Sequence, residues 1–259
     1  MKTLALLFLA SQLTNPPSGP VHPAIDSVKA DNVHLEDGLI AYYPFNGNAN
    51  DASGHNNNGF ILDGGMLTYD EHGKANSALG GNGDGGRVIV SNNGSLVIDS
   101  VFSVSFTFSI KRYSRHLFVA MVDNSSGKGV GFGVGTNIPN DKDLVFGVVD
   151  NTADCDGYGN SRNSHTVISQ FVPQPGSWYQ MTCTFNRGVA KMFVNGKMIS
   201  MQSFREKAIH VCPNAQLIIG GWWQKDPGTS LAGAMDEVRI YNREVNGEEV
   251  AELAKKFLD

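Results

Sequence analysis

The sequence predicts an all-β protein built as a sandwich of two antiparallel sheets. The clearest signal is Val101–Ile110, VFSVSFTFSI, in which apolar and small polar residues alternate without a break. Strand-like segments recur between residues 39 and 241, each bounded by Gly, Asn, Asp or Pro, and no helical pattern separates them. Many short strands without intervening helices form stacked sheets, because each sheet must bury an apolar face against another layer.

The strands follow from their local patterns. In Val101–Ile110 the side chains that should face the core are Phe102, Val104, Phe106, Phe108 and Ile110, and those that should face solvent or a polar cleft are Ser103, Ser105, Thr107 and Ser109. Further strands are predicted at Leu39–Phe45, Arg87–Val90, Leu117–Val122, Val130–Val134, Leu144–Val149, Thr166–Phe171, Tyr179–Phe185, Ala190–Val194, Leu217–Ile219 and Met235–Tyr241.

Two local features outside the strands are also predicted. Asn195-Gly196 stands at the centre of Lys191–Met198 and suits a two-residue hairpin turn, because both residues tolerate positive φ angles. Near the end of the chain, Asn246–Phe257 places apolar residues at helical spacing, with Glu early and Lys late in the segment. A short C-terminal helix with a structural role is therefore expected.

Composition limits the possible functions. The 259 residues with 41% apolar content suit one ordinary domain or two small ones, and the absence of internal repeats favours one. The 30 glycines are scattered singly, as expected of many tight turns. The net charge of -5 and the lack of a basic cluster argue against nucleic acid as a partner. No apolar run after the N-terminus is long enough to span a membrane.

The N-terminal residues suggest export. Residues 1–10, MKTLALLFLA, place one Lys before a compact apolar stretch, and a Pro-rich polar stretch follows. We expect an export segment over 1–20, a linker over 21–37 and one domain over 38–259. The expected location is secreted, cell-surface or periplasmic; the alternative for 1–20 is a disordered or helical extension.

The three cysteines allow at most one disulfide bond. Cys183 lies between Met181 and Phe185 in MTCTF, on the same strand face, and is expected to be buried as a small apolar residue. Cys155 and Cys212 both lie in loop-like sequence and are the remaining pair for a bridge in an exported protein. The alternative is three free thiols.

Three segments of the sequence resemble motifs of one family. These are GLIAYYPFNGNANDASGHNNNG from Gly38, SWYQMTCTFNRGVAKMFVNGKMI from Ser177 and GAMDEVRIYNREVNGEEVAELA from Gly233. Together they resemble laminin G-like domains of the concanavalin A-like lectin and glucanase group, from Gly38 to the C-terminus. The resemblance implies a jelly-roll sandwich in which the first and last strands lie close together.

The same resemblance implies a structural cation between the loop after the first strand and the acidic residue of the last motif. Carried over by position, its ligands are Asn46, Asn48, Asp51 and Asp236. Calcium is the expected ion, because it accepts 6–8 oxygen ligands in flexible geometry. The alternative is that these Asn and Asp side chains bond the backbone of their own turn.

Carbohydrate binding would need aromatic rings and polar side chains on one surface. Trp222 and Trp223 follow a strand end, and strict alternation would point them to opposite faces, leaving one available to stack on a sugar. A second candidate surface is the polar loop Asp150–His165, with Tyr158, Arg162 and His165 as ligand residues. The alternatives are core packing for the Trp pair and a solvated loop for the second segment.

No catalytic residues are predicted. The sequence lacks E-x-D-x-x-E, E-x-D-x-E, G-x-S-x-G and H-E-x-x-H, and Asp236-Glu237, being adjacent, should point to opposite faces of a strand. The expected function is non-catalytic binding of a glycan or cell-surface polysaccharide. A polysaccharide hydrolase or lyase, and an adhesion or surface-assembly domain with a protein partner, remain as alternatives.

Overall fold

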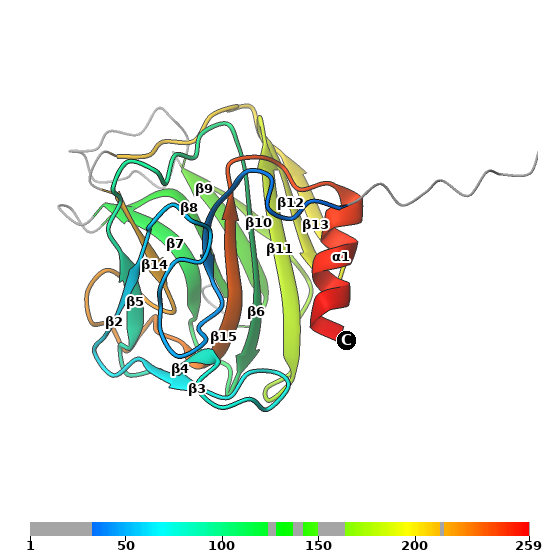
Figure 1. Ribbon diagram of the computed structural model, residues 1–259. Helices are drawn as coiled ribbons and strands as arrows, with labels where there is room; N and C mark the ends of the chain where they lie inside the picture. The colour runs from blue at the N-terminus through cyan, green and yellow to red at the C-terminus, as the bar shows by residue number, and fades with distance from the viewer. Residues whose placement is uncertain (1–32, 124–127, 137–141, 150–163, 213–214, 259) are drawn as a thin grey trace, which may run out of the picture. The chain divides into compact units, whose positions relative to one another are not determined.

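The computed structural model describes residues 33–258 except 124–127, 137–141, 150–163 and 213–214. These residues form two antiparallel sheets and one short helix at the C-terminal end (Figure 1). The prediction of an all-β, two-sheet sandwich with a C-terminal helix is confirmed. No helix among the described residues is long and apolar enough to cross a membrane.

The first sheet is named here the β6 sheet, after the strand near its centre. Its order is β13 (Lys197–Ser203), β12 (Val189–Val194), β11 (Trp178–Asn186), β6 (Val101–Ile110), β15 (Ala232–Tyr241), β4 (Ala78–Asn82) and β3 (Met66–Thr68), and β1 (Leu39–Tyr43) also pairs with β15. On β15, the first half pairs with β4 from Ala232 to Met235, and the second half pairs with β1 from Val238 to Tyr241. The first and last strands are therefore neighbours, as expected.

The second sheet is named the β8 sheet. Its order is β10 (Ser164–Ile168), β9 (Leu144–Val149), β8 (Lys128–Thr136), β7 (Leu117–Asp123), β14 (Ala215–Ile219), β5 (Arg87–Val90) and β2 (Gly59–Leu62). Strands β2, β3, β4 and β13 were not among those expected from sequence. They have three to seven residues each, and β13 is mostly exposed at the edge of its sheet.

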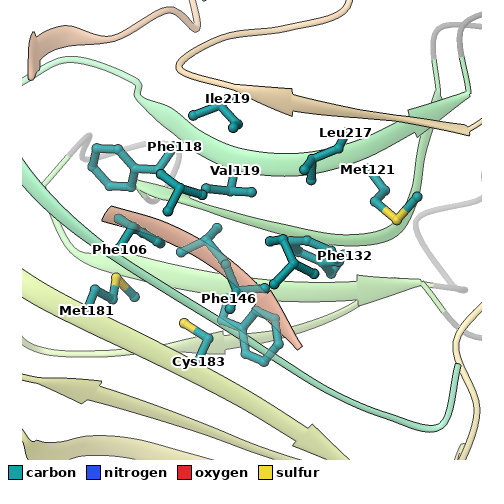
Figure 2. Close-up of a cluster of buried hydrophobic side chains, with 14 of the residues drawn as sticks. Phe106, Phe118, Val119, Met121, Phe132, Phe146, Met181, Cys183, Leu217 and Ile219 are labelled. Carbon is teal, nitrogen blue, oxygen red and sulfur yellow. The ribbon is translucent and has the colours of Figure 1, made fainter. Parts of the chain in front are cut away.

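The core lies between the two sheets and is dominated by aromatic rings. Figure 2 shows the side chains of Phe106, Met181 and Cys183 from the β6 sheet together with Phe118, Phe132 and Phe146 from the β8 sheet. The Phe106 and Phe118 ring centroids are 5.7 Å apart, and those of Phe102 and Phe132 are 5.1 Å apart. Such ring pairs link the layers.

The cysteines divide as the sequence suggests for Cys183. Its thiol is free and fully buried in the core. Cys212 is disulfide-bonded. Cys155, its expected partner, lies outside the described residues.

The predicted hairpin and helix are both present. Asn195 and Gly196 have φ angles of 48° and 75°, and β12 and β13 pair on either side of them. Helix α1 (Gly247–Leu258) lies beside β11 and β12 in Figure 1 and buries Val250, Leu253 and Ala254.

The start of α1 is held by a reciprocal cap. The side chain of Asn246 accepts from the N–H groups of Glu248 and Glu249, both at 2.9 Å, and its own N–H donates to Glu249 at 2.7 Å. Arg243 also donates to both carboxylate oxygens of Glu249, at 2.6 and 2.7 Å. Burial raises the pKa of Glu249, but the bonds from Arg243 and the Asn246 backbone outweigh it and leave that pKa below its ordinary value.

Replacing Glu249 by Gln should lower the free energy of unfolding by about 1–2 kcal/mol at neutral pH, because Arg243 and Asn246 lose a charged acceptor. Since the folded pKa lies below the unfolded value of about 4.3, this stabilisation is fully present above that pH. It is lost as the pH falls through the folded pKa. Urea unfolding of both proteins across the acidic range measures it.

Glu248→Gln is the matched control, since Glu248 is exposed in the same turn. It should follow the wild type at every pH. An effect of E249Q that stays constant with pH would contradict the charged-acceptor explanation.

Candidate functional site

A polar pocket lies where β15 changes partner. It has a volume of about 350 Å³ and lies between the loops that follow β1 and β3, the polar face of the β6 sheet, and α1. The residues that line it are Asn46, Asp70, Glu71, His72, Lys74, Ser105, Phe106, Thr107, Gln180, Asp236, Glu237, Arg239, Leu253, Lys256 and Phe257. The predicted polar face of β6 thus faces a polar cleft.

The expectation that Asp236 and Glu237 point to opposite faces is wrong. The pairing of β15 with β6 shifts register between Asp236 and Arg239, and Glu237 has a φ of 54°. This bulge breaks the alternation, so both carboxylates line the polar pocket. Glu237 accepts from the Tyr42 hydroxyl at 2.9 Å and pairs with Arg239.

Asp236 is the more buried of the two, with 5% of its surface exposed. One of its oxygens accepts from the Glu237 N–H at 2.7 Å. Burial raises the pKa of Asp236 to about 9, and the carboxylates of Glu237, Glu71 and Asp70 also act in this direction. The pocket therefore brings four carboxylates together with the basic side chains of Lys74, Arg239 and Lys256.

Three residues that line this pocket carry a buried side-chain oxygen with no hydrogen-bond partner in the described part of the chain. These atoms are Glu71 Oε2, Thr107 Oγ1 and Gln180 Oε1. Burial also raises the pKa of Glu71. Buried oxygens without partners are costly, and a bound cation is one way to satisfy them.

The structure divides the four predicted metal ligands into two pairs. Asn46 and Asp236 both line the polar pocket, although Asn46 Oδ1 also accepts from Lys74 Nζ at 2.6 Å. Asn48 Oδ1 accepts from the Asn50 N–H at 2.8 Å, within its own turn.

Asp51 is committed to the backbone. Its carboxylate accepts from the N–H groups of Tyr42 at 2.9 Å, Ser53 at 2.8 Å and Asn57 at 2.9 Å. These bonds tie the turn after β1 to the strand itself. Both Asp51 and Asn48 therefore show the backbone-bonding pattern that was the alternative to metal binding.

The oxygens of the polar pocket fit calcium better than a transition metal. Within the described ranges, no three His, Cys, Asp or Glu side chains converge as a transition-metal site would require. The lining residues supply the carboxylates of Asp70, Glu71, Asp236 and Glu237 and the neutral side-chain oxygens of Thr107, Gln180 and Asn46. Mixed carboxylate and neutral oxygen ligands are what calcium accepts.

A second hollow, named here the sheet groove, lies on the outer face of the β8 sheet. It has a volume of about 460 Å³. Its lining residues are Arg115, His116, Leu117, Gly133, Gly135, Thr136, Val145, Gly147, Thr166, Trp222, Asp226 and Thr229. Strand pairing brings Gly133 opposite Gly147, and Gly147 opposite Thr166, so the lining crosses from β8 to β10.

The expectation that Trp222 and Trp223 point to opposite faces is also wrong. Both are half-buried and pack on the cluster of Ala120, Val122 and Ile218, which is separate from the main core. The alternation fails because β14 ends at Ile219 and Gly220 turns the chain with a φ of 80°. Trp222 lines the sheet groove.

The other predicted ligand residues do not join this groove in the described part of the chain. His165 lies on β10, where its Nε2 is 3.3 Å from Glu206 Oε2 and its ring centroid is 5.0 Å from that of Phe204. Tyr158 and Arg162 lie outside the described residues.

The charged groups of the groove differ in whether they are already bonded to other parts of the protein. Asp226 accepts from the Gly228 N–H at 2.7 Å and from the Thr229 hydroxyl at 2.9 Å, so it is committed to its own turn. Arg115 is exposed and has no ion pair within the described ranges. Arg115 and the exposed Thr166 can therefore meet a ligand's oxygens, and the sequence pattern identified neither.

Comparison with known proteins gives one family and a common fold. Residues 81–251, more than half of the chain, match the sequence profile of a laminin G-like family described as the concanavalin A-like lectin/glucanases superfamily. No curated protein matches the chain.

Several solved structures share the architecture. Domain 4 of AbnA, an extracellular arabinanase from Geobacillus stearothermophilus, in complex with arabinotriose, is similar with a TM-score of 0.59 and 19% identity over 83% of this chain and 98% of that domain. The binding domain of Paraclostridial Mosquitocidal Protein 1 is similar with a TM-score of 0.68 and 18% identity, over 87% of this chain and 54% of that one.

The botulinum neurotoxin serotype D ligand-binding domain, in complex with N-acetylneuraminic acid, gives a TM-score of 0.62 and 15% identity, over 85% of this chain and 51% of that one. The chain thus spans about half the length of these toxin domains. At these identities the similarity establishes the shared fold.

Replacing Asp51 by Ala should lower the free energy of unfolding by about 2–3 kcal/mol, because three backbone N–H groups lose a charged acceptor. The loss should be the same with calcium and with EDTA, since the carboxylate serves the turn. Urea unfolding in both buffers measures it, with Asn48→Ala as a milder control. A loss that appears only with calcium would instead identify Asp51 as a metal ligand.

Proposed function

We propose that this chain, which belongs to the concanavalin A-like lectin/glucanase superfamily, is an exported non-catalytic module that binds carbohydrate in the sheet groove. The observation that carries the proposal is the half-buried ring of Trp222 in a groove lined by both apolar and polar side chains. The sugar complexes of the arabinanase domain and the serotype D toxin domain support the same class of ligand.

The groove has the two surfaces that a sugar requires. Sugar rings carry apolar C–H faces and polar hydroxyl edges, so they bind where an aromatic ring stands beside hydrogen-bonding groups. Trp222, Leu117 and Val145 supply apolar surface, and Arg115 and Thr166 supply polar atoms at the margin. The disulfide bond of Cys212 agrees with an oxidising compartment, and hence with the export expected from residues 1–20.

Calcium in the polar pocket is the second part of the proposal. Asp236 and Glu71, with Asn46, Thr107 and Gln180, would hold the ion, which would neutralise the two desolvated carboxylates. The ion would connect β15 and β6 to the loops after β1 and β3, so we propose a structural role for it.

Replacing Trp222 by Ala should weaken glycan binding at least tenfold, about 1.4 kcal/mol, because a sugar loses its stacking surface. Retention on immobilised glycans and titration with arabinotriose, cellotriose and 3′-sialyllactose measure this effect. Trp223→Ala is the matched control, since Trp223 packs on the same cluster but does not line the groove.

If the W222A variant binds glycan as tightly as the wild type does, the sugar must bind elsewhere on the protein. The same incubations should yield no new reducing ends and no unsaturated products; either product would favour the hydrolase or lyase instead. Capture of a protein partner without glycan retention would favour the adhesion alternative.

Chelation should lower the melting temperature, and calcium should restore it. At free calcium 100 times the Kd, the expected stabilisation is about 2.7 kcal/mol. Asp236→Asn should abolish most of the calcium-induced shift, whereas Asn48→Ala should leave it intact. An equal melting temperature of the wild type in EDTA and in calcium would refute the calcium proposal.

A further inference from the structure

One row of residues crosses the outer face of the β8 sheet from edge to edge. Cross-strand partners share a face of a sheet, and the pairings connect, in order, Phe60, Ile89, Ile218, Ala120, Gly133, Gly147 and Thr166. Along this row the side chains become smaller, from the ring of Phe60 to the hydrogen atoms of Gly133 and Gly147, and Thr166 is again larger. The sheet groove lies over the glycines, where no side chain covers the main chain.

Glycine within a strand weakens it, so its presence has a cause. The usual causes are a positive φ angle or the close approach of other backbone atoms. Gly135 has the second cause, because a Cβ there would stand far inside contact distance of the His116 carbonyl oxygen. The fold itself therefore requires glycine at position 135.

Among the described residues, neither cause applies to Gly133 or Gly147. Neither has a positive φ, and they face each other in an unbroken stretch of β8–β9 pairing. A Cβ on Gly133 would lie 3.8 Å from Ala120 Cβ and 3.8 Å from Leu117 Cδ1, and a Cβ on Gly147 would lie 3.8 Å from Thr166 Oγ1. These are ordinary contacts, so the fold would accept a side chain at both positions.

We infer that Gly133 and Gly147 form a bare floor on which one ring of the bound glycan lies flat, and that this floor selects an unbranched stretch of glycan. The inference rests on the proposed function and identifies what its groove accepts. Both glycines line the groove and are partly exposed, as a floor must be. A side chain at either position would occupy the space of the ring.

The dimensions of the floor support one ring. Neighbouring strands lie about 4.8 Å apart and same-face residues about 6.8 Å apart along a strand. Gly133 and Gly147, which are partly exposed, therefore leave a few ångströms of main chain uncovered between them. Leu117, Val145, Thr166 and Trp222 stand around it, so a branch on the seated ring would meet one of them.

Gly133→Ala and Gly147→Ala test the floor. Each variant should keep the wild-type melting temperature or exceed it, and each should bind glycan at least tenfold more weakly. The probes are arabinotriose, cellotriose and 3′-sialyllactose, and each linear trisaccharide is compared with a counterpart branched on its central ring. Amide NMR signals of Gly133 and Gly147 should shift on titration of the wild type.

Two further glycines serve as controls. Gly247→Ala, where a Cβ would meet nothing within 4 Å, should leave both stability and binding unchanged. Gly135→Ala should lower the melting temperature, because the new Cβ meets backbone. The contrast separates space needed by the fold from space needed by the ligand.

The outcomes distinguish this inference from the proposed function. If W222A loses binding while G133A and G147A keep wild-type affinity, the sheet groove is supported as the glycan site and the role of the glycine floor is refuted. Equal affinity for branched and linear counterparts overturns the selection of unbranched chains. If the wild type binds none of the probes, both the proposed site and the glycine floor are refuted. The same holds if W222A, G133A and G147A all bind as tightly as the wild type.

Discussion

The pairing of β15 along both of its edges is the constraint on which the rest of the described structure depends. On one edge β15 pairs with β6 on both sides of the bulge between Asp236 and Arg239, and on the other edge it pairs first with β4 and then with β1. The change of partner falls at Asp236-Glu237, where the bulge is. A strand that must serve two partners in succession bends between them, and that bend places two adjacent carboxylates in one pocket.

The two faces of the β6 sheet are used differently as a result. Its inner face carries the phenylalanines that meet the β8 sheet, whereas its outer face carries Ser and Thr side chains that are buried beneath α1 and the neighbouring loops. Ser103 shows what such burial requires, since its hydroxyl donates to Arg243 O at 2.8 Å and accepts from Val245 N at 3.0 Å. Thr107, on the same face, has no such partner among the described residues.

Sequence reasoning succeeded where a local pattern decides the structure. The alternation of Val101–Ile110, the Asn195-Gly196 turn and the spacing of Val250, Leu253 and Ala254 each specify their element without help from distant residues. It failed where distant residues decide. Nothing around Glu237 announces a positive φ, because the bulge arises from the partners of β15.

The candidate sites were predictable to a smaller extent for the same reason. Asp236 was identified through a motif, but Glu71 and Gln180 reach the same pocket from a loop and from β11, which no spacing along the chain relates to Asp236. Trp222 was recognised as an aromatic candidate, yet its neighbours Gly133 and Gly147 meet it only through the order of the strands. A glycine carries no chemistry of its own, so its meaning emerges only when the room around it is known.

The outward face of β8 has one more consequence. Main-chain atoms are common to all residues, so any substitution at Gly133 or Gly147 adds side-chain atoms above the main chain of this surface. Each such side chain would make the sheet groove shallower. The side chains that can change the chemistry of the sheet groove without adding bulk to its floor are therefore those around it, among them Arg115, Thr166 and Trp222.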